Sequence, residues 1–96
     1  MMRKYETLFV LKTNIEEAAR VALIEKFTGI INSDGEVTNV DEWGTRKLAY
    51  EIEKLTEGYY ILVDFKANPE LPRELERNFK ISDDVLRYVV INKEEK

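Results

Sequence analysis

The sequence contains no cysteine and no histidine. A chain without cysteine can build neither a disulfide framework nor a thiolate metal site, so a cytoplasmic location is the default expectation. A chain without histidine lacks the commonest general base at neutral pH and the commonest ligand for transition metals. Catalysis would have to depend on carboxylates, lysine or backbone groups. We therefore expect a protein that is not an enzyme and that holds no metal and no cofactor.

Long apolar segments are also missing. The longest apolar runs have four or five residues, such as Tyr59 to Val63, whereas a membrane-spanning helix needs about 20. No apolar stretch follows Arg3 and Lys4, so no signal peptide is expected either. The 96 residues, of which 44% are hydrophobic and 35% charged, instead predict one globular domain over residues 1–96, with no membrane partner.

Positive charge is in deficit as well. The chain has 15 Lys and Arg against 19 Asp and Glu, which gives a formal net charge of −4. Tight binding to nucleic acids comes largely from the counterions that Lys and Arg release, so a protein that binds RNA tightly by itself should be basic. If this chain binds RNA, we expect a local cationic patch that acts beside a more basic partner protein.

Hydrophobic periodicity divides the chain into six segments. In chain order it predicts a strand over residues 3–12, a helix to about residue 32, a strand from about 36 to 52, a strand over 59–67, a helix carrying Leu71, Leu75 and Phe79, and a strand over 85–92. The order β-α-β-β-α-β is the ferredoxin-like arrangement, an α+β fold. Right-handed crossovers place two helices on one face of a four-stranded antiparallel sheet. The other face is left open for a partner.

Polar residues and glycines suggest where these segments begin and end. Asn14 is placed to cap the first helix, with Glu17 three residues later as in a capping box. Gly35 suits a left-handed residue at the C-terminus of that helix. Residues 54–58 are predicted to form a hairpin connection, and residues 93–96 a frayed, solvated end.

The most informative segment runs from Glu42 to Ile52. Its glycine, Gly44, interrupts a strand-like pattern and predicts a β-bulge. Such a bulge would direct Arg46 and Lys47 outward beside Trp43 and Tyr50. Cationic and aromatic side chains together bind phosphates and bases. The alternative, which spacing alone does not remove, is an amphipathic strand with a solvated, charged edge.

Two functions that this fold can carry do not fit the residues present. An acyl-phosphate hydrolase needs a phosphate-binding loop after the first strand, but residues 12–14 contain neither glycine nor arginine. An RNA reader of the RRM type needs a leading cation and aromatic side chains on the third strand. This chain lacks that cation and has Ile61 and Asp64 where aromatic rings would stand.

A small-ligand sensor or a dimerisation domain remains a possible alternative. Either function needs only an open sheet face with apolar patches, which Leu8, Val10, Val89 and Ile91 could supply. The acidic pairs at residues 16–17 and 83–84 are better explained by a helix start and a turn than by a metal site, because negative side chains are favoured at helix N-termini.

Four segments of the chain resemble the bacterial small-subunit ribosomal protein six family in order and spacing. They are residues 2–6 (Met-Arg-Lys-Tyr-Glu), 43–52 (Trp-Gly-Thr-Arg-Lys-Leu-Ala-Tyr-Glu-Ile), 58–60 (Gly-Tyr-Tyr) and 84–88 (Asp-Val-Leu-Arg-Tyr). The chain departs from the pattern at Glu51, where many members carry proline. That change affects the strand edge and leaves the two cations in place.

The resemblance implies a ribosomal, cytoplasmic protein without catalytic residues. It implies that the chain pairs with ribosomal protein eighteen and that the heterodimer binds the central domain of small-subunit ribosomal RNA, with no small-molecule substrate. The implied RNA-binding residues are Arg3, Tyr5, Arg46, Lys47, Tyr50, Lys54 and Arg87. Core packing is the alternative for the two tyrosines, and a surface arginine with a packed aliphatic stem is the alternative for Arg87.

Overall fold

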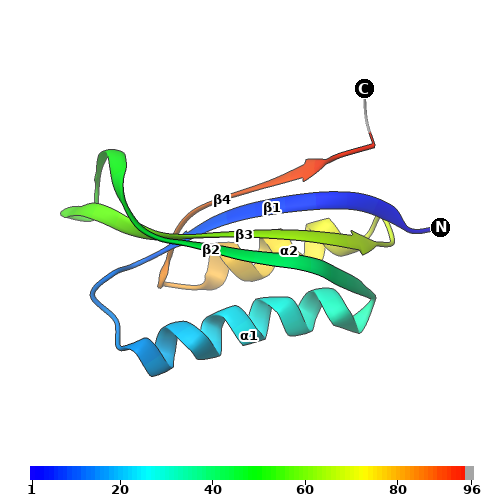
Figure 1. Ribbon diagram of the computed structural model, residues 1–96, viewed down its shortest axis with the longest axis horizontal. Helices are drawn as coiled ribbons and strands as arrows, with labels where there is room; N and C mark the ends of the chain where they lie inside the picture. The colour runs from blue at the N-terminus through cyan, green and yellow to red at the C-terminus, as the bar shows by residue number, and fades with distance from the viewer. Residues whose placement is uncertain (95–96) are drawn as a thin grey trace.

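A computed structural model describes residues 1–94 and confirms the predicted ferredoxin-like fold. Its elements are β1 (Arg3–Leu11), α1 (Glu17–Ser33), β2 (Gly35–Ile52), β3 (Leu55–Ala67), α2 (Leu71–Ile81) and β4 (Val85–Asn92). Within these residues the four strands form one sheet in the order β2-β3-β1-β4, and each neighbouring pair is antiparallel. Both helices lie on one side of the sheet, so the opposite side, here called the open face, has no helix over it (Figure 1).

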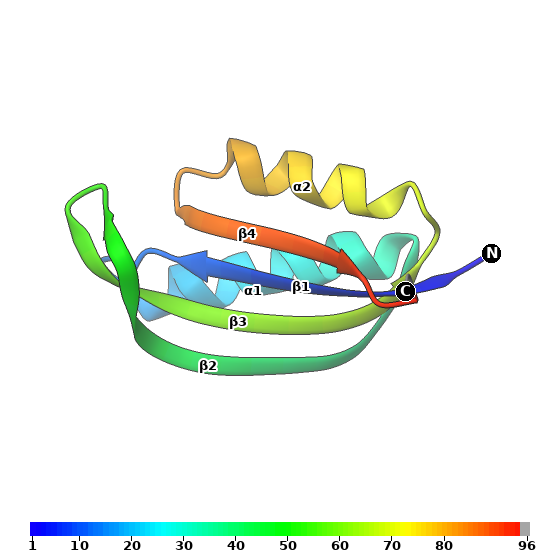
Figure 2. The same ribbon diagram turned by 90° about the horizontal axis from the view of Figure 1, so that it is seen from above.

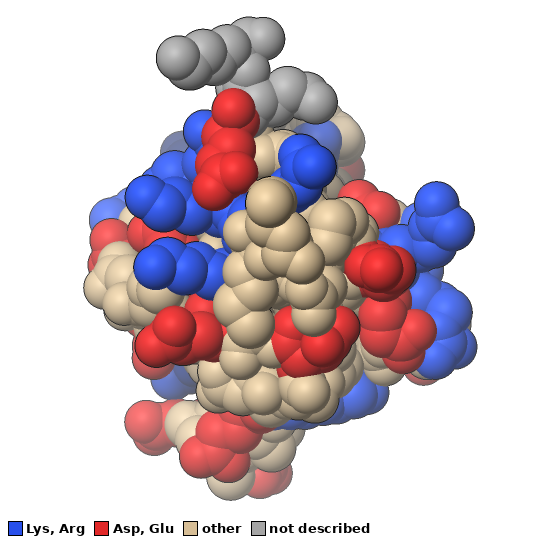
Figure 3. Space-filling model, turned by 90° about the vertical axis from the view of Figure 1, so that its right-hand side faces the viewer, with Lys and Arg blue, Asp and Glu red and all other residues tan. Residues whose placement is uncertain are grey.

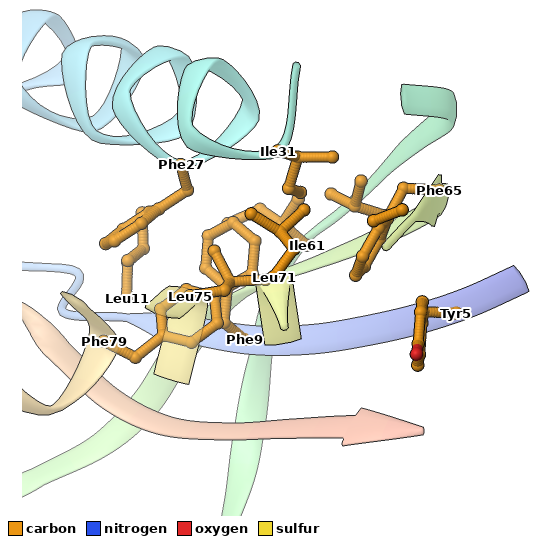
Figure 4. Close-up of a cluster of buried hydrophobic side chains, with 12 residues drawn as sticks. Tyr5, Phe9, Leu11, Phe27, Ile31, Ile61, Phe65, Leu71, Leu75 and Phe79 are labelled. Atoms are coloured by element: carbon orange, nitrogen blue, oxygen red, sulfur yellow. The ribbon is translucent and has the colours of Figure 1, made fainter. Parts of the chain in front are cut away.

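The core lies between the sheet and the helices (Figure 4). Alternate residues of the two central strands face this core, as the strand period requires. Three phenylalanines join its layers: Phe9 of β1 lies 5.3 Å from Phe27 of α1 and 5.0 Å from Phe79 of α2, and the two helix rings lie 4.6 Å apart, all between ring centroids. The other large, fully buried side chains are Leu11, Ile31, Ile61, Val63, Phe65 and Leu75.

The ends of α1 differ from the prediction. Asn14 does not cap the helix, because Glu16 is still extended (ψ 153°) and the first helical bond runs from Arg20 N to Glu16 O. Gly35 does not take the left-handed conformation expected of it either, since among the described glycines only Gly44 has a positive φ, and Gly35 begins β2. Gly35 is needed there for a different reason. A side chain at this position would collide with the backbone oxygen of Lys66 on β3.

The hairpin between β2 and β3 is tighter than predicted. Ile52 pairs with Leu55, so only Glu53 and Lys54 form the turn, and residues 55–58 belong to β3. Both turn residues have positive φ, 50° and 67°. This is the requirement of a type I′ turn, which normally selects Asn or Gly. The prediction missed the turn because its sequence carries neither residue.

Strand β2 is five residues longer than its partner, with 18 residues against 13. Thr38 and Trp43 are each an extra residue, so the bulge predicted at Gly44 is confirmed, with φ of 85° at the glycine. The other three extra residues lie near the tip, where residues 48–51 face Thr56 alone. Bulges bend a strand and increase its twist. The tip accordingly curls above the open face (Figure 1).

The last described residues are held in place and do not fray. The backbone N–H of Lys93 donates to Lys4 O at 2.9 Å, and its ammonium lies 3.2 Å from Asp64 Oδ1. The prediction of a frayed end is therefore wrong for Lys93. For Glu95 and Lys96 it lies outside the described residues.

Replacing Gly44 with alanine should destabilise the protein by about 1–2 kcal/mol, because a side chain at positive φ is strained. Gly29→Ala is the matched control: an added Cβ would meet nothing within 4 Å at either glycine, but Gly29 lies inside α1. The control should stabilise the protein by about 1 kcal/mol. Urea unfolding of both variants measures the difference. Equal effects of the two substitutions would contradict the strain at Gly44.

Candidate nucleic-acid interface

Five of the seven residues expected to bind RNA gather at the hairpin end of the molecule. Arg46, Lys47, Tyr50 and Lys54 lie on the hairpin, and Arg87 reaches Tyr50 from β4. We call these five residues the hairpin cluster. All five are exposed, and Tyr50 is 60% exposed. The core-packing alternative therefore does not hold for Tyr50.

The bulge at Gly44 sets the directions of the two adjacent cations. Beyond it, Arg46 pairs with Gly58 and Lys47 with Glu57. Successive residues of a strand point to opposite faces, so Arg46 faces the open side and Lys47 the other side. Trp43 stacks on Tyr60 with 6.2 Å between ring centroids and 7° between planes. The hairpin tip thus presents cations on both of its faces.

Arg87 and Tyr50 bind each other. The Arg87 guanidinium donates from Nη1 to the Tyr50 hydroxyl at 2.8 Å, and its Cζ lies 5.3 Å from the centroid of the ring. The contact joins β4 to the curled tip, two segments that do not pair in the sheet. A flat guanidinium against an aromatic ring can also stack with a base or contact a phosphate.

The turn at the tip has a second anchor that sequence reasoning missed. Lys12, just after β1, lies 3.2 Å from the Glu53 carboxylate. Because Lys12 and Glu53 lie 41 positions apart in the sequence, no local pattern predicts the pair. The contact leaves Lys54, the other turn residue, exposed at the apex.

Arg3 and Tyr5 do not join the hairpin cluster. Arg3 pairs with Ala67, nine positions along β3 from Gly58, which is roughly 30 Å at the rise of a strand. Tyr5 is only 6% exposed and stacks on Phe65 within the core, with 5.5 Å between centroids. Tyr5 therefore packs in the core, as the alternative expectation had it, because its side chain lies on the face of β1 that is turned toward the helices.

Sequence reasoning also missed two lysines near Arg3. Lys4 and Lys66 are direct cross-strand partners, and both are exposed. Figure 3 views this end of the molecule and shows basic groups interspersed with acidic ones. The end therefore offers single cations to a ligand, not a continuous basic surface.

A hollow of about 200 Å³ lies on the open face beside the Arg87–Tyr50 contact. Apolar side chains from all four strands form most of its lining, among them Leu8, Val10, Leu48, Ile52, Tyr60 and Val89. Within residues 1–94 there is no group of three acidic side chains placed to hold a metal. No helix there is long and apolar enough to cross a membrane.

Comparison with known proteins assigns the family. The sequence profile of ribosomal protein S6 matches residues 4–92. The chain belongs to the ribosomal protein S6 family. The small ribosomal subunit protein bS6 of Clostridium novyi (strain NT) is 62% identical over 94 residues, which cover 97% of this chain and 99% of that protein. The bS6 protein of Alkaliphilus oremlandii (strain OhILAs) is 55% identical over 93 residues, with coverage of 97% and 99%.

A solved structure supports the same family. The crystal structure of 30S ribosomal protein S6 from Thermotoga maritima superposes with a TM-score of 0.91 at 30% identity, and covers 97% of this chain and 89% of that one. A member of the S6 family is a ribosomal protein and not an enzyme, as the absence of histidine led us to expect. Its place is the ribosome, in the cytoplasm.

A polar network fixes β2 just before the bulge at Gly44. The Tyr59 hydroxyl donates to Glu42 Oε1 at 2.7 Å, and Arg20 of α1 lies 4.3 Å above the Tyr59 ring. The pKa of Tyr59 is raised above its ordinary value, mainly by the hydrogen bond to Glu42 and to a smaller extent by burial. The network links α1, β3 and β2, and so steadies the base of the hairpin.

Glu42→Gln should lower the pKa of Tyr59, because it removes the largest cause of the shift. Because the pKa of Tyr59 is higher in the folded protein than in the unfolded chain, its protonated form stabilises the fold below the ordinary tyrosine pKa of about 10. This stabilisation is lost as the pH rises through the raised pKa. Absorbance titration of the phenolate, with Tyr59→Phe to identify its signal, measures the change. If Tyr59 ionises over the same pH range in the parent and in Glu42→Gln, Glu42 is not the cause of its raised pKa.

Proposed function

We propose that this chain is a structural component of the small ribosomal subunit that binds the central domain of its RNA together with ribosomal protein eighteen. The exposed hairpin cluster is the observation that carries the proposal. Three of its cations, Arg46, Lys47 and Lys54, are exposed on the hairpin whose tip curls above the open face, where a phosphate backbone can reach them. Phosphate contacts of this kind set the position of a protein on RNA.

The need for a partner follows from charge. A net charge of −4 opposes an RNA backbone, and affinity grows with the number of phosphates that Lys and Arg neutralise. The four cations of the hairpin cluster give weak, salt-sensitive binding by themselves. A basic partner at the same site supplies the missing charge, and the heterodimer then binds RNA far more tightly than this chain does by itself.

Arg3 lies at the opposite end of the sheet from the hairpin cluster and supports the same proposal. It is exposed and lies roughly 30 Å from the hairpin cluster by strand count. One RNA helix that runs along the molecule can therefore meet both sites. Arg87 and Tyr50 offer the RNA a stacked guanidinium and ring, whereas Tyr5 is omitted from the proposed contacts because it is buried.

The small-ligand alternative is less well supported. Ligand pockets usually measure about 300–1,000 Å³, and the hollow on the open face is smaller, at about 200 Å³. It also lacks a group of free polar side chains for recognition, since its arginine, Arg87, is bound to Tyr50.

Arg46→Ala with Lys47→Ala should weaken RNA binding by the heterodimer and flatten its salt dependence. Each lost phosphate contact removes about 0.7 to 0.9 from the slope of log affinity against log salt. The matched control is Arg73→Ala with Lys26→Ala, which removes the same charge from the exposed sides of the two helices. Filter binding to a central-domain RNA fragment at several salt concentrations measures both. Equal losses in the two double variants would contradict the hairpin site, and nanomolar binding by the chain alone would contradict the need for a partner.

Lys54→Gly separates stability from RNA binding. Glycine relieves the positive φ of 67°, so we expect a gain of about 0.5–1 kcal/mol in the free energy of unfolding. RNA binding by the heterodimer should fall, because a cation at the apex is lost. Lys54→Arg is the control: it keeps both the cation and the strained backbone angle, so RNA binding and stability should stay close to those of the parent. Thermal unfolding and RNA binding assays test the pair, and unchanged RNA affinity in Lys54→Gly would remove this residue from the site.

A further inference from the structure

The backbone ladder does not by itself set the direction of the hairpin tip. Pairing between β2 and β3 stops after Lys47 and resumes only where Ile52 meets Leu55. Between these points, residues 48–51 share the single partner Thr56. Contacts between the tip and the rest of the sheet therefore have to hold the tip in its curled position.

One of these contacts is apolar and passes over Gly58 of β3. A side chain at Gly58 would collide with Val10 of β1 and would lie only 3.2 Å from Leu48 of the tip. Glycine at this position thus lets Leu48 and Val10 come together above β3. Apolar packing is not directional, so it keeps the tip on the sheet without deciding where the turn points.

Lys12 fixes the turn itself. Its ammonium lies 3.2 Å from the Glu53 carboxylate, and its side chain is only 21% exposed. Its backbone N–H donates to Asp84 O at 2.9 Å. Surface ion pairs usually contribute little, in part because two mobile side chains must be ordered. Lys12 is already held in place, so the pair with Glu53 loses less, and it sets the position of the next residue, Lys54.

Arg87 holds the tip at a second point, through its hydrogen bond to Tyr50. Both contacts join a cation of the sheet body to an acceptor on the tip, and together they set the tip's orientation. The cations of the hairpin itself are not used for this purpose. Within residues 1–94, no ion pair engages Arg46, Lys47 or Lys54. These three side chains stay available to a ligand while the tip is held.

We propose that Lys12 and Glu53 form a positioning pair, which holds the hairpin cluster in the arrangement that binds RNA without either residue contacting the RNA. The inference rests on the proposed function, because it names what sets the geometry of that hairpin site. Groups that are ordered before binding do not pay the cost of ordering when they bind. Glu53 therefore favours the binding of a polyanion, which is the opposite of what its charge alone predicts.

This opposition of sign gives the test. Glu51 is the matched control, because it is exposed, lies two positions from Glu53 and has no ion pair within residues 1–94. Glu51→Gln and Glu53→Gln each remove one negative charge from the hairpin, and this loss by itself strengthens RNA binding. With the heterodimer and a central-domain RNA fragment, filter binding should show slightly tighter binding for Glu51→Gln. Binding should be about two- to fivefold weaker for Glu53→Gln.

The failures of the two proposals can be told apart. If the parent heterodimer does not bind the RNA fragment, the proposed function fails. If the parent binds and Glu53→Gln binds as tightly as Glu51→Gln, the positioning pair is refuted. Titration calorimetry with ribosomal protein eighteen alone should give the parent's affinity for both variants. A weaker affinity of Glu53→Gln in that experiment would place its effect on the protein partner and would also overturn the inference.

A double-mutant cycle tests whether Glu53 acts through Lys12. In a Lys12→Met background the pair is already broken, so Glu53→Gln should no longer weaken RNA binding and should instead behave as Glu51→Gln does. Weakening that persists in this background would contradict the pair. Amide hydrogen exchange over residues 48–54 should be faster in Glu53→Gln than in Glu51→Gln, because the tip is released. Equal exchange in the two variants would show that the tip is held without Glu53 and would overturn the inference.

Discussion

The unequal lengths of two paired strands shape the functional half of this molecule. Because β2 has five more residues than β3, the excess must leave the regular ladder. Each bulge changes which residues face the helices. Val40 pairs with the core residue Val63, whereas beyond the bulge at Trp43 the even-numbered residue Arg46 faces the open side. The same mismatch curls the tip out of line with the rest of β2 and β3 (Figure 2). The hairpin carries four residues of the hairpin cluster, and Val10 of β1 is left only 4% exposed.

The two faces of the sheet have different tasks. The helix side holds the aromatic cluster around Phe9, Phe27 and Phe79 and buries most of the apolar area. Its one buried polar side chain among the described residues, Thr7, donates to Val89 O at 2.8 Å and leaves no unmet hydrogen bond there. The open side keeps apolar and charged groups in reach of solvent. A fold that is complete on one face can thus serve as an assembly surface on the other.

Several features of the site depended on contacts that local patterns do not encode. The spacing of Gly44 and the cations after it predicted the bulge, because a bulge is a local property of one strand. The Arg87–Tyr50 and Lys12–Glu53 contacts join residues 37 and 41 positions apart, and their existence depends on how far the tip curls. Tyr5 was assigned to RNA on resemblance, yet the alternation of β1 directs it into the core. The helix cap failed for a related reason: Asn14 has suitable chemistry, but the loop must first cross from the sheet to the helix layer.

The sequence by itself determined the types and order of the elements, the face that the helices cover and the absence of catalytic chemistry. These follow from the periods of apolar residues and from composition, both of which act over short distances along the chain. Only the tertiary structure decided that Arg3 stands far from the hairpin cluster, that Arg87 is bound to Tyr50 and that a hollow lies between them and β1. Strand register and twist set those positions, and both arise from pairing between segments that are distant in the chain.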